Sequence, residues 1–134
     1  MKTLLTASES AKLIKLGVSS ERASNMWVKS SSRSYTCEKN NLLLDTLAWR
    51  KENVSNSENY GFIFTLADIL DILPKKVKIH RDGDTLSMIY HCGQWRVGYS
   101  NCAEYCNHTK VAPELIDALY SLLLWCLEKG YVKV

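Results

Sequence analysis

The sequence predicts an α+β fold in which an antiparallel β-meander packs against a long C-terminal helix, with shorter helices beside them. Three runs of alternating apolar and polar residues follow one another over residues 77–100, separated by Asp82-Gly83 and Gly93-Gln94. The segment Pro113–Lys129 has helical periodicity and is apolar over most of its surface. With 134 residues, of which 46% are hydrophobic and 23% charged, we expect a single domain over residues 1–134.

The N-terminal part of the chain predicts one helix and one short strand. Thr6 and Glu9 form a capping-box pattern, in which hydroxyl and carboxylate satisfy each other's backbone amides, and this predicts a helix over residues 6–16. A strand is expected around Met26–Val28, because three apolar residues stand together there. The serine-rich segment Ser30–Ser34 then predicts an exposed loop.

The middle of the chain alternates between apolar and polar segments. Residues 41–50 have leucines at helical spacing and predict a helix, whereas residues 51–59 are polar and predict a surface loop. A strand is expected over residues 60–64. Thr65 then begins a short helix in which Asp68 occupies the third position, where a carboxylate suits the positive helix end.

The two turns of the meander set its expected register. If Asp-Gly forms a two-residue type I′ turn, Val77 lies opposite Met88. If Gly-Gln forms a type II′ turn, Tyr90 lies opposite Val97. Both assignments place the apolar side chains of the three strands on one face of the sheet, which is the face that we expect to be buried.

The predicted C-terminal helix is the most apolar segment of the chain, since only a narrow polar stripe runs along it. Tyr120, Leu124 and Trp125 flank that stripe. A helix this apolar is either enclosed within its domain or covered by another protein. We therefore expect these three side chains to form an interface with a protein partner or with a second copy of the chain. A short edge strand is expected at residues 131–134.

Composition points to the reducing cytoplasm. The cysteines number five and follow no disulfide framework, which favours free thiols. No apolar run approaches the roughly 20 residues that span a bilayer, and the first residues lack the apolar core of a signal peptide. The net charge of +3 is too small to indicate a nucleic-acid or membrane partner by itself. We expect a cytoplasmic protein that does not bind membranes.

Residues of zinc-ligand type gather in one stretch of the C-terminal half, but their spacing does not favour a zinc site. They are His91, Cys92, Cys102, Cys106 and His108. No Cys-x-x-Cys knuckle occurs, and the expected meander separates Cys92 from Cys102 by about 25 Å. A smaller site made of Cys102, Cys106 and His108 lacks a fourth protein ligand. We expect ordinary thiols and no cofactor, and keep zinc binding as an alternative.

No catalytic constellation is evident. His91 stands next to Cys92, but neighbours on a strand point to opposite faces, so we expect no thiol–imidazole pair there. The chain also lacks the GxSxG, Walker-type, GxGxxG and HExxH patterns of common enzyme sites. The sequence favours a protein without enzymatic activity.

A nucleic-acid interface is a further alternative. The second face of the expected meander would carry the basic side chains Lys78, His80, His91 and Arg96. Proteins that bind single strands need aromatic side chains on the same face as the charge, whereas the aromatic residues here fall on the other face. The basic face is therefore more simply interpreted as the solvated side of a half-buried antiparallel sheet.

Three segments together resemble a known family. They are Thr65–Pro74, Trp95–Tyr99 and the helix from Leu119 to the Gly130-Tyr131 pair. This arrangement resembles small uncharacterised proteins of gut bacteria and of their phages or mobile elements, over the C-terminal half only. The resemblance implies a phage or mobile-element origin and brings no activity. We expect a non-catalytic accessory protein that acts through protein–protein interaction or self-association. A nucleic-acid-associated protein and a small zinc-binding protein are the alternatives.

Overall fold

The chain divides into two compact units in the computed structural model. The N-terminal unit comprises Leu4–Asp68, and the C-terminal unit comprises Met1–Thr3 together with Ile69–Val134. Each unit contains helical segments and antiparallel strands, so the predicted α+β class is confirmed. The expectation of a single domain stays a prediction. The structure describes residues 1–30, 33–38, 60–78, 83–101 and 105–132.

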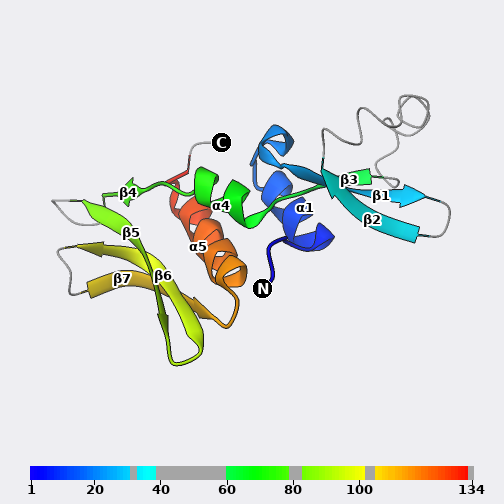
Figure 1. Cartoon of the computed structure of the whole chain (residues 1–134). Coiled ribbons are helices and arrows are strands. Elements are labelled where there is room, and N and C mark those ends of the chain that lie inside the picture. The colour runs from blue at the N-terminus through cyan, green and yellow to red at the C-terminus, as the bar shows by residue number, and fades with distance from the viewer. Residues whose placement is uncertain (31–32, 39–59, 79–82, 102–104, 133–134) are drawn as a thin grey trace. The chain divides into compact units, whose positions relative to one another are not determined.

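The N-terminal unit has a three-stranded antiparallel sheet in the order β2-β1-β3 (Figure 1). Its elements are α1 (Ala7–Lys15), the 3-10 helix η1 (Ser20–Arg22), β1 (Asn25–Ser30), β2 (Arg33–Glu38) and β3 (Tyr60–Ile63). The helix predicted over residues 6–16 and the two predicted strands are confirmed. The helix and the loop predicted over residues 41–59 lie outside the described residues.

The loop predicted at Ser30–Ser34 is wrong in its extent. Ser30 pairs with Arg33 and Lys29 with Ser34, so the strands continue to within two residues of each other. Residues 33–38 alternate between polar and apolar side chains, with Tyr35 and Cys37 as the apolar ones, and strand β2 follows this alternation.

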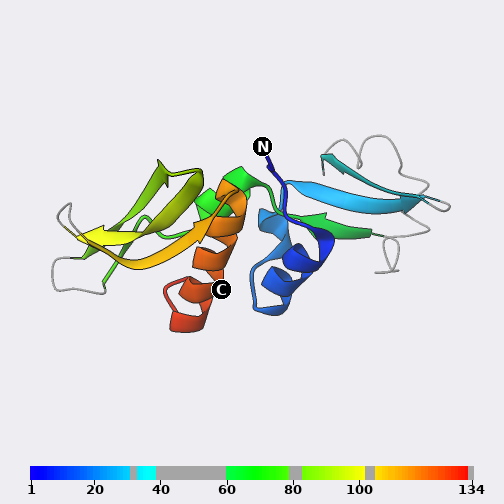
Figure 2. The ribbon, with the colours of Figure 1, turned by 90° about the horizontal axis from the view of Figure 1, so that it is seen from below.

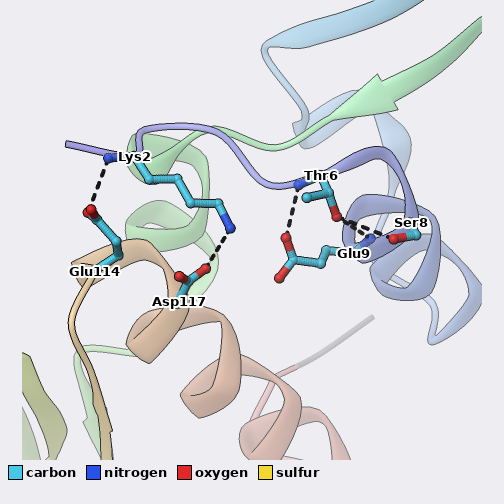
Figure 3. A network of polar contacts seen from close by, with 6 residues as sticks. All are labelled: Lys2, Thr6, Ser8, Glu9, Glu114 and Asp117. Atoms are coloured by element: carbon cyan, nitrogen blue, oxygen red, sulfur yellow. Dashed lines mark hydrogen bonds and ion pairs between the residues drawn. The ribbon is translucent and has the colours of Figure 1, made fainter.

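Helix α1 begins with the predicted capping box (Figure 3). The Thr6 amide donates to Glu9 Oε1 at 3.0 Å, and the Glu9 amide donates to Thr6 Oγ1 at 3.2 Å. The buried Ser10 hydroxyl then connects the helix to the residue after β3, because it accepts from the Phe64 amide at 3.2 Å. Leu13 of the same helix is fully buried. A local signal in the sequence therefore positions the helix against the sheet.

Strands β1 and β3 come together where an indole ring lies over a glycine. Trp27 is the register partner of Gly61, and a Cβ atom at residue 61 would lie 2.0 Å from Trp27 Nε1. No carbon atom can approach a ring nitrogen so closely, so glycine is needed at this position for the indole of Trp27 to lie where it does.

Helix α4 (Leu66–Ile72) begins with a second capping box, and the boundary between the two units falls within it. The Thr65 amide donates to Asp68 Oδ2 at 2.9 Å, and the Asp68 amide donates to Thr65 Oγ1 at 3.1 Å. At the other end, the Lys75 ammonium donates to the carbonyl oxygens of Leu70 and Leu73, as expected for a cation beside a helix C-terminus. The predicted start of this helix is confirmed.

The C-terminal unit has a four-stranded antiparallel sheet in the order β4-β5-β6-β7, and α5 packs against β6 and β7 (Figures 1 and 2). The meander and the long helix are thus confirmed. Strand β7 was not predicted, and Tyr131 and Val132 are not in the edge strand predicted at residues 131–134. The elements are β4 (Lys76–Val77), β5 (Asp84–His91), β6 (Gln94–Asn101), β7 (Tyr105–Ala112) and α5 (Leu115–Lys129).

The predicted register of the meander is wrong at both turns. Val77 pairs with Asp84 instead of Met88, so β4 and β5 do not pair in the register of a two-residue turn at Asp82-Gly83. Tyr90 pairs with Trp95 instead of Val97.

The second turn lies one residue earlier than predicted. Cys92 and Gly93 form it, with φ values of 52° and 76°, and positive φ at both central residues is what a type I′ turn requires. Moving the turn by one residue shifts each pairing between β5 and β6 by two residues. A shift by two leaves every side chain on its expected face.

The core of the C-terminal unit lies between α5 and one face of the sheet. Val97 and Tyr99 on β6 are fully buried. The Tyr99 hydroxyl donates to the Pro74 carbonyl oxygen at 2.7 Å and accepts from Cys126 Sγ at 3.7 Å. The helix contributes the buried side chains Ile116, Ala118, Leu119, Leu122, Leu123 and Cys126.

The first residues of the chain are held against the start of α5 (Figure 3). The Lys2 amide donates to Glu114 Oε2 at 3.1 Å, and the Lys2 ammonium pairs with Asp117 Oδ1 at 2.7 Å. Both acids lie where the helix macrodipole is positive, so they are stabilised by the helix as well as by Lys2. These contacts explain why residues 1–3 belong to the C-terminal unit.

Candidate functional site

Large exposed apolar side chains gather at one end of the four-stranded sheet. Met88, Ile89 and Tyr90 on β5 are 43%, 53% and 59% exposed, and Val111 on β7 is 47% exposed. Among the described residues, only Met1 and Leu16 are other large apolar side chains of this kind. We call Met88, Ile89, Tyr90 and Val111 the hairpin patch.

The register shows that the patch covers both faces of the sheet. Arg96 pairs with Ile89 on one side and with Val111 on the other, so these three side chains lie in a row on one face. We call this the outer face, because Val97 and Tyr99 point the other way, toward α5. Tyr90 lies on the helix side, where its ring is 5.3 Å from that of Trp95.

The outer face around the patch carries basic and neutral side chains. His91, Gln94 and Arg96 are exposed there. No outer-face residue of β5 or β6, from Thr85 to Ser100, is acidic. A ligand or partner at this end of the sheet would therefore meet apolar side chains beside the positive charge of Arg96.

A thiol and an imidazole meet at the turn next to the patch. Cys92 Sγ lies 3.6 Å from His91 Nε2, and both residues are exposed. The prediction that these neighbours point apart is wrong, because it assumed that Cys92 continues the strand. Its left-handed backbone conformation turns the thiol back toward the imidazole.

Two of the residues predicted as a nucleic-acid face lie together. His91 and Arg96 occupy the outer face, whereas Lys78 is exposed beyond the end of β4 and His80 lies outside the described residues. The rings of Tyr90, Trp95 and Tyr99 fall on the helix side, as expected. Nucleic-acid binding by this face stays a prediction.

The residues predicted as a partner interface on α5 are half-buried. The ring of Trp125 lies 6.4 Å from that of Tyr99 and 5.3 Å from that of Tyr131. Tyr120 and Leu124 are likewise neither fully buried nor exposed. Their role in binding a partner stays a prediction.

The metal-site alternative involves residues that the structure describes only in part. The backbone pairs Cys106 with Ser100 and His108 with Tyr99. Cys102 and the side chains of these two residues lie outside the described part. Among the His, Cys, Asp and Glu side chains that are described, no three lie close enough together to hold a metal ion.

Sequence reasoning missed Ile89 and Val111. The signal for Ile89 is present, because Met88-Ile89-Tyr90 is a run of three apolar residues in a strand whose neighbours alternate. Successive side chains point to opposite faces, so one of the three had to lie on the polar face. For Val111 no such signal exists without the pairing of β7.

Tyr99 and Cys126, which are hydrogen-bonded to each other in the core of the C-terminal unit, both have raised pKa values. Burial raises the pKa of the Tyr99 phenol well above its ordinary value, and the neighbouring Cys126 raises it further. Burial also raises the pKa of the Cys126 thiol, while its hydrogen bond to Tyr99 acts in the opposite direction. Both groups are therefore held in their neutral forms, which makes Cys126 a structural thiol.

This pair is expected to make the protein less stable in alkali. An unfolded chain loses the cysteine proton near pH 8.5 and the tyrosine proton near pH 10, whereas the folded chain keeps both. Stability is thus complete below about pH 8.5 and falls above it, by up to about 1.4 kcal/mol per pH unit for each group. Urea unfolding between pH 7 and pH 11 measures this fall. Tyr99→Phe should make it shallower above pH 10, and an unchanged slope would contradict the prediction.

Comparisons with known proteins found no relative: the chain matches no protein-family model, no curated protein and no solved structure. In the described part of the chain, no helix is both long enough and apolar enough to cross a membrane.

Proposed function

We propose that the protein is a non-catalytic accessory protein of phage or mobile-element type, located in the cytoplasm, that acts by binding a protein partner through the hairpin patch. The supporting observation is the gathering of four exposed large apolar side chains at one end of one sheet. Two of them, Ile89 and Val111, lie on either side of Arg96 on the outer face. Exposed apolar side chains that gather in this way are typical of interaction surfaces.

The charge on the outer face indicates the chemistry of the partner. Arg96 lies between Ile89 and Val111, and no acid neutralises it on this face of β5 and β6. A second copy laid face to face would bring Arg96 close to its own counterpart, and like charges oppose such a contact. The partner is therefore a different protein, whose contact surface combines apolar side chains with a carboxylate that pairs with Arg96.

Selection from a displayed peptide library tests this proposal. The peptides enriched on the full chain should combine aromatic or aliphatic residues with Asp or Glu. Synthetic versions should bind at least about tenfold more weakly to Ile89→Ser and to Arg96→Gln, as expected for central contact residues. Thr85→Ala, an exposed outer-face position at the other end of β5, is the matched control and should bind as the wild type does. Fluorescence anisotropy measures these affinities.

Other results would replace the proposal. Enriched peptides without carboxylates, or affinities that Ile89→Ser leaves unchanged, would remove it. Light scattering that shows a dimer which Ile89→Ser disrupts would establish self-association instead. Salt-dependent binding of single-stranded DNA or RNA that Arg96→Gln abolishes would favour the nucleic-acid alternative. Stoichiometric zinc in the purified untagged protein would favour the zinc-binding alternative.

A further inference from the structure

The turn between β5 and β6 places a nucleophile beside a base in a position that solvent reaches. Cys92 Sγ and His91 Nε2 are 3.6 Å apart, which is within hydrogen-bond reach for sulfur. Access and a nearby proton acceptor are the two conditions that distinguish a reactive thiol from a structural one. Cys126 fails the first condition, because it is fully buried.

We propose that Cys92 is a site of thiol–disulfide exchange with small anionic disulfides, of which glutathione disulfide is the probe. The imidazole of His91 accepts the thiol proton, and the resulting thiolate attacks one sulfur of the disulfide. A bond forms between Cys92 Sγ and that sulfur while the original S–S bond breaks. The other half leaves as a thiolate and takes up the proton. Cys92 is oxidised to a mixed disulfide, and the leaving half is reduced.

The charge around the turn selects an anionic disulfide. His91 pairs across the hairpin with Gln94, and Arg96 follows two residues later on the same face. Arg96 is the one charged side chain on this face of β5 and β6, and no acid lies beside it on these two strands, so its charge acts on a disulfide that approaches the turn. An anionic disulfide is attracted to such a surface and a cationic disulfide is repelled.

The first test follows the mixed disulfide of each cysteine by peptide mapping and mass spectrometry after glutathione disulfide is added to the full chain. Cys92 should react faster than Cys126, and Cys92→Ser should remove its adduct. His91→Gln should slow the reaction of Cys92 with glutathione disulfide about tenfold. A fully positioned base contributes about a hundredfold or more, and the effect here is smaller because the pair is exposed. The substitution should also change the pH profile of the rate. Gln94→Ala is the matched control and should react as the wild type does.

The second test separates charge selection from proton transfer. Arg96→Gln should slow the reaction of glutathione disulfide severalfold but leave that of cystamine, a cationic disulfide, unchanged or faster. Equal rates for wild type and His91→Gln, or a Cys92 that reacts no faster than Cys126, would overturn the proposal. Thr85→Ala, at the other end of β5, should leave the exchange rate unchanged. The exchange uses no residue of the hairpin patch, so failure of that patch as a binding surface would leave this proposal standing.

Discussion

Leu119→Ala is expected to lower the free energy of unfolding by about 2–5 kcal/mol, which is a large part of the stability of an ordinary domain. Leu119 is fully buried in α5, on the helix that packs against β6 and β7. Removing its isobutyl group loses the transfer free energy of the deleted carbons and leaves a cavity in a core made by one helix and one sheet face. Urea unfolding followed by circular dichroism measures the loss.

Leu124→Ala is the matched control for this prediction. It removes the same group from the same helix, at a position that is only half-buried. Its cost should stay below about 1.5 kcal/mol, because less apolar area is lost and solvent can fill the space. Equal costs for the two variants would mean that α5 does not bury the face described above. The result for Leu124 also gives the stability background against which its predicted interface role can be measured.

The elements that sequence reasoning found are those with local signals. Thr6 with Glu9 and Thr65 with Asp68 are capping boxes, and in both cases the structure contains the reciprocal hydrogen bonds. Such signals work because the groups that satisfy each other are three residues apart, so no tertiary contact is needed to form them. Helix α5 was found because its apolar side chains recur at helical spacing up to Gly130, which ends it in a left-handed conformation.

The features that were missed depend on pairing between distant residues. Strand β7 has no clean apolar alternation and forms beside β6, with an irregularity after Tyr99. The position of the second turn was wrong because Gly93 fits either of two turns, and a left-handed Cys92 is uncommon. That single-residue error hid the candidate site, since only the observed turn brings the Cys92 thiol to His91. The predicted apolar face was still correct, because shifting the pairing of β5 with β6 by two residues leaves each side chain on the same face of the sheet.

Asp68→Ala is expected to lower the free energy of unfolding by about 2–4 kcal/mol. The reason is that its one carboxylate accepts hydrogen bonds from two separate segments of the N-terminal unit. Asp68 is 9% exposed. It accepts from the Thr65 amide at 2.9 Å, from the Ser24 amide at 2.8 Å and from the Ser24 hydroxyl. Alanine removes the cap of α4 and leaves partly buried donors without an acceptor. The loss should appear in urea unfolding and in faster hydrogen exchange at the amides of Ser24 and Thr65.

Two further variants separate the cap from the charge. Asp68→Asn keeps the shape and one acceptor oxygen, so it should lose about half as much stability as alanine. Asp71→Ala removes an exposed acid from the same helix and should cost less than about 1 kcal/mol. If Asp68→Ala and Asp71→Ala were equally mild, Asp68 would act only as a surface charge. The larger loss at Asp68 would instead show that the residue predicted from a three-residue spacing also holds the start of β1, forty-four positions away in the sequence.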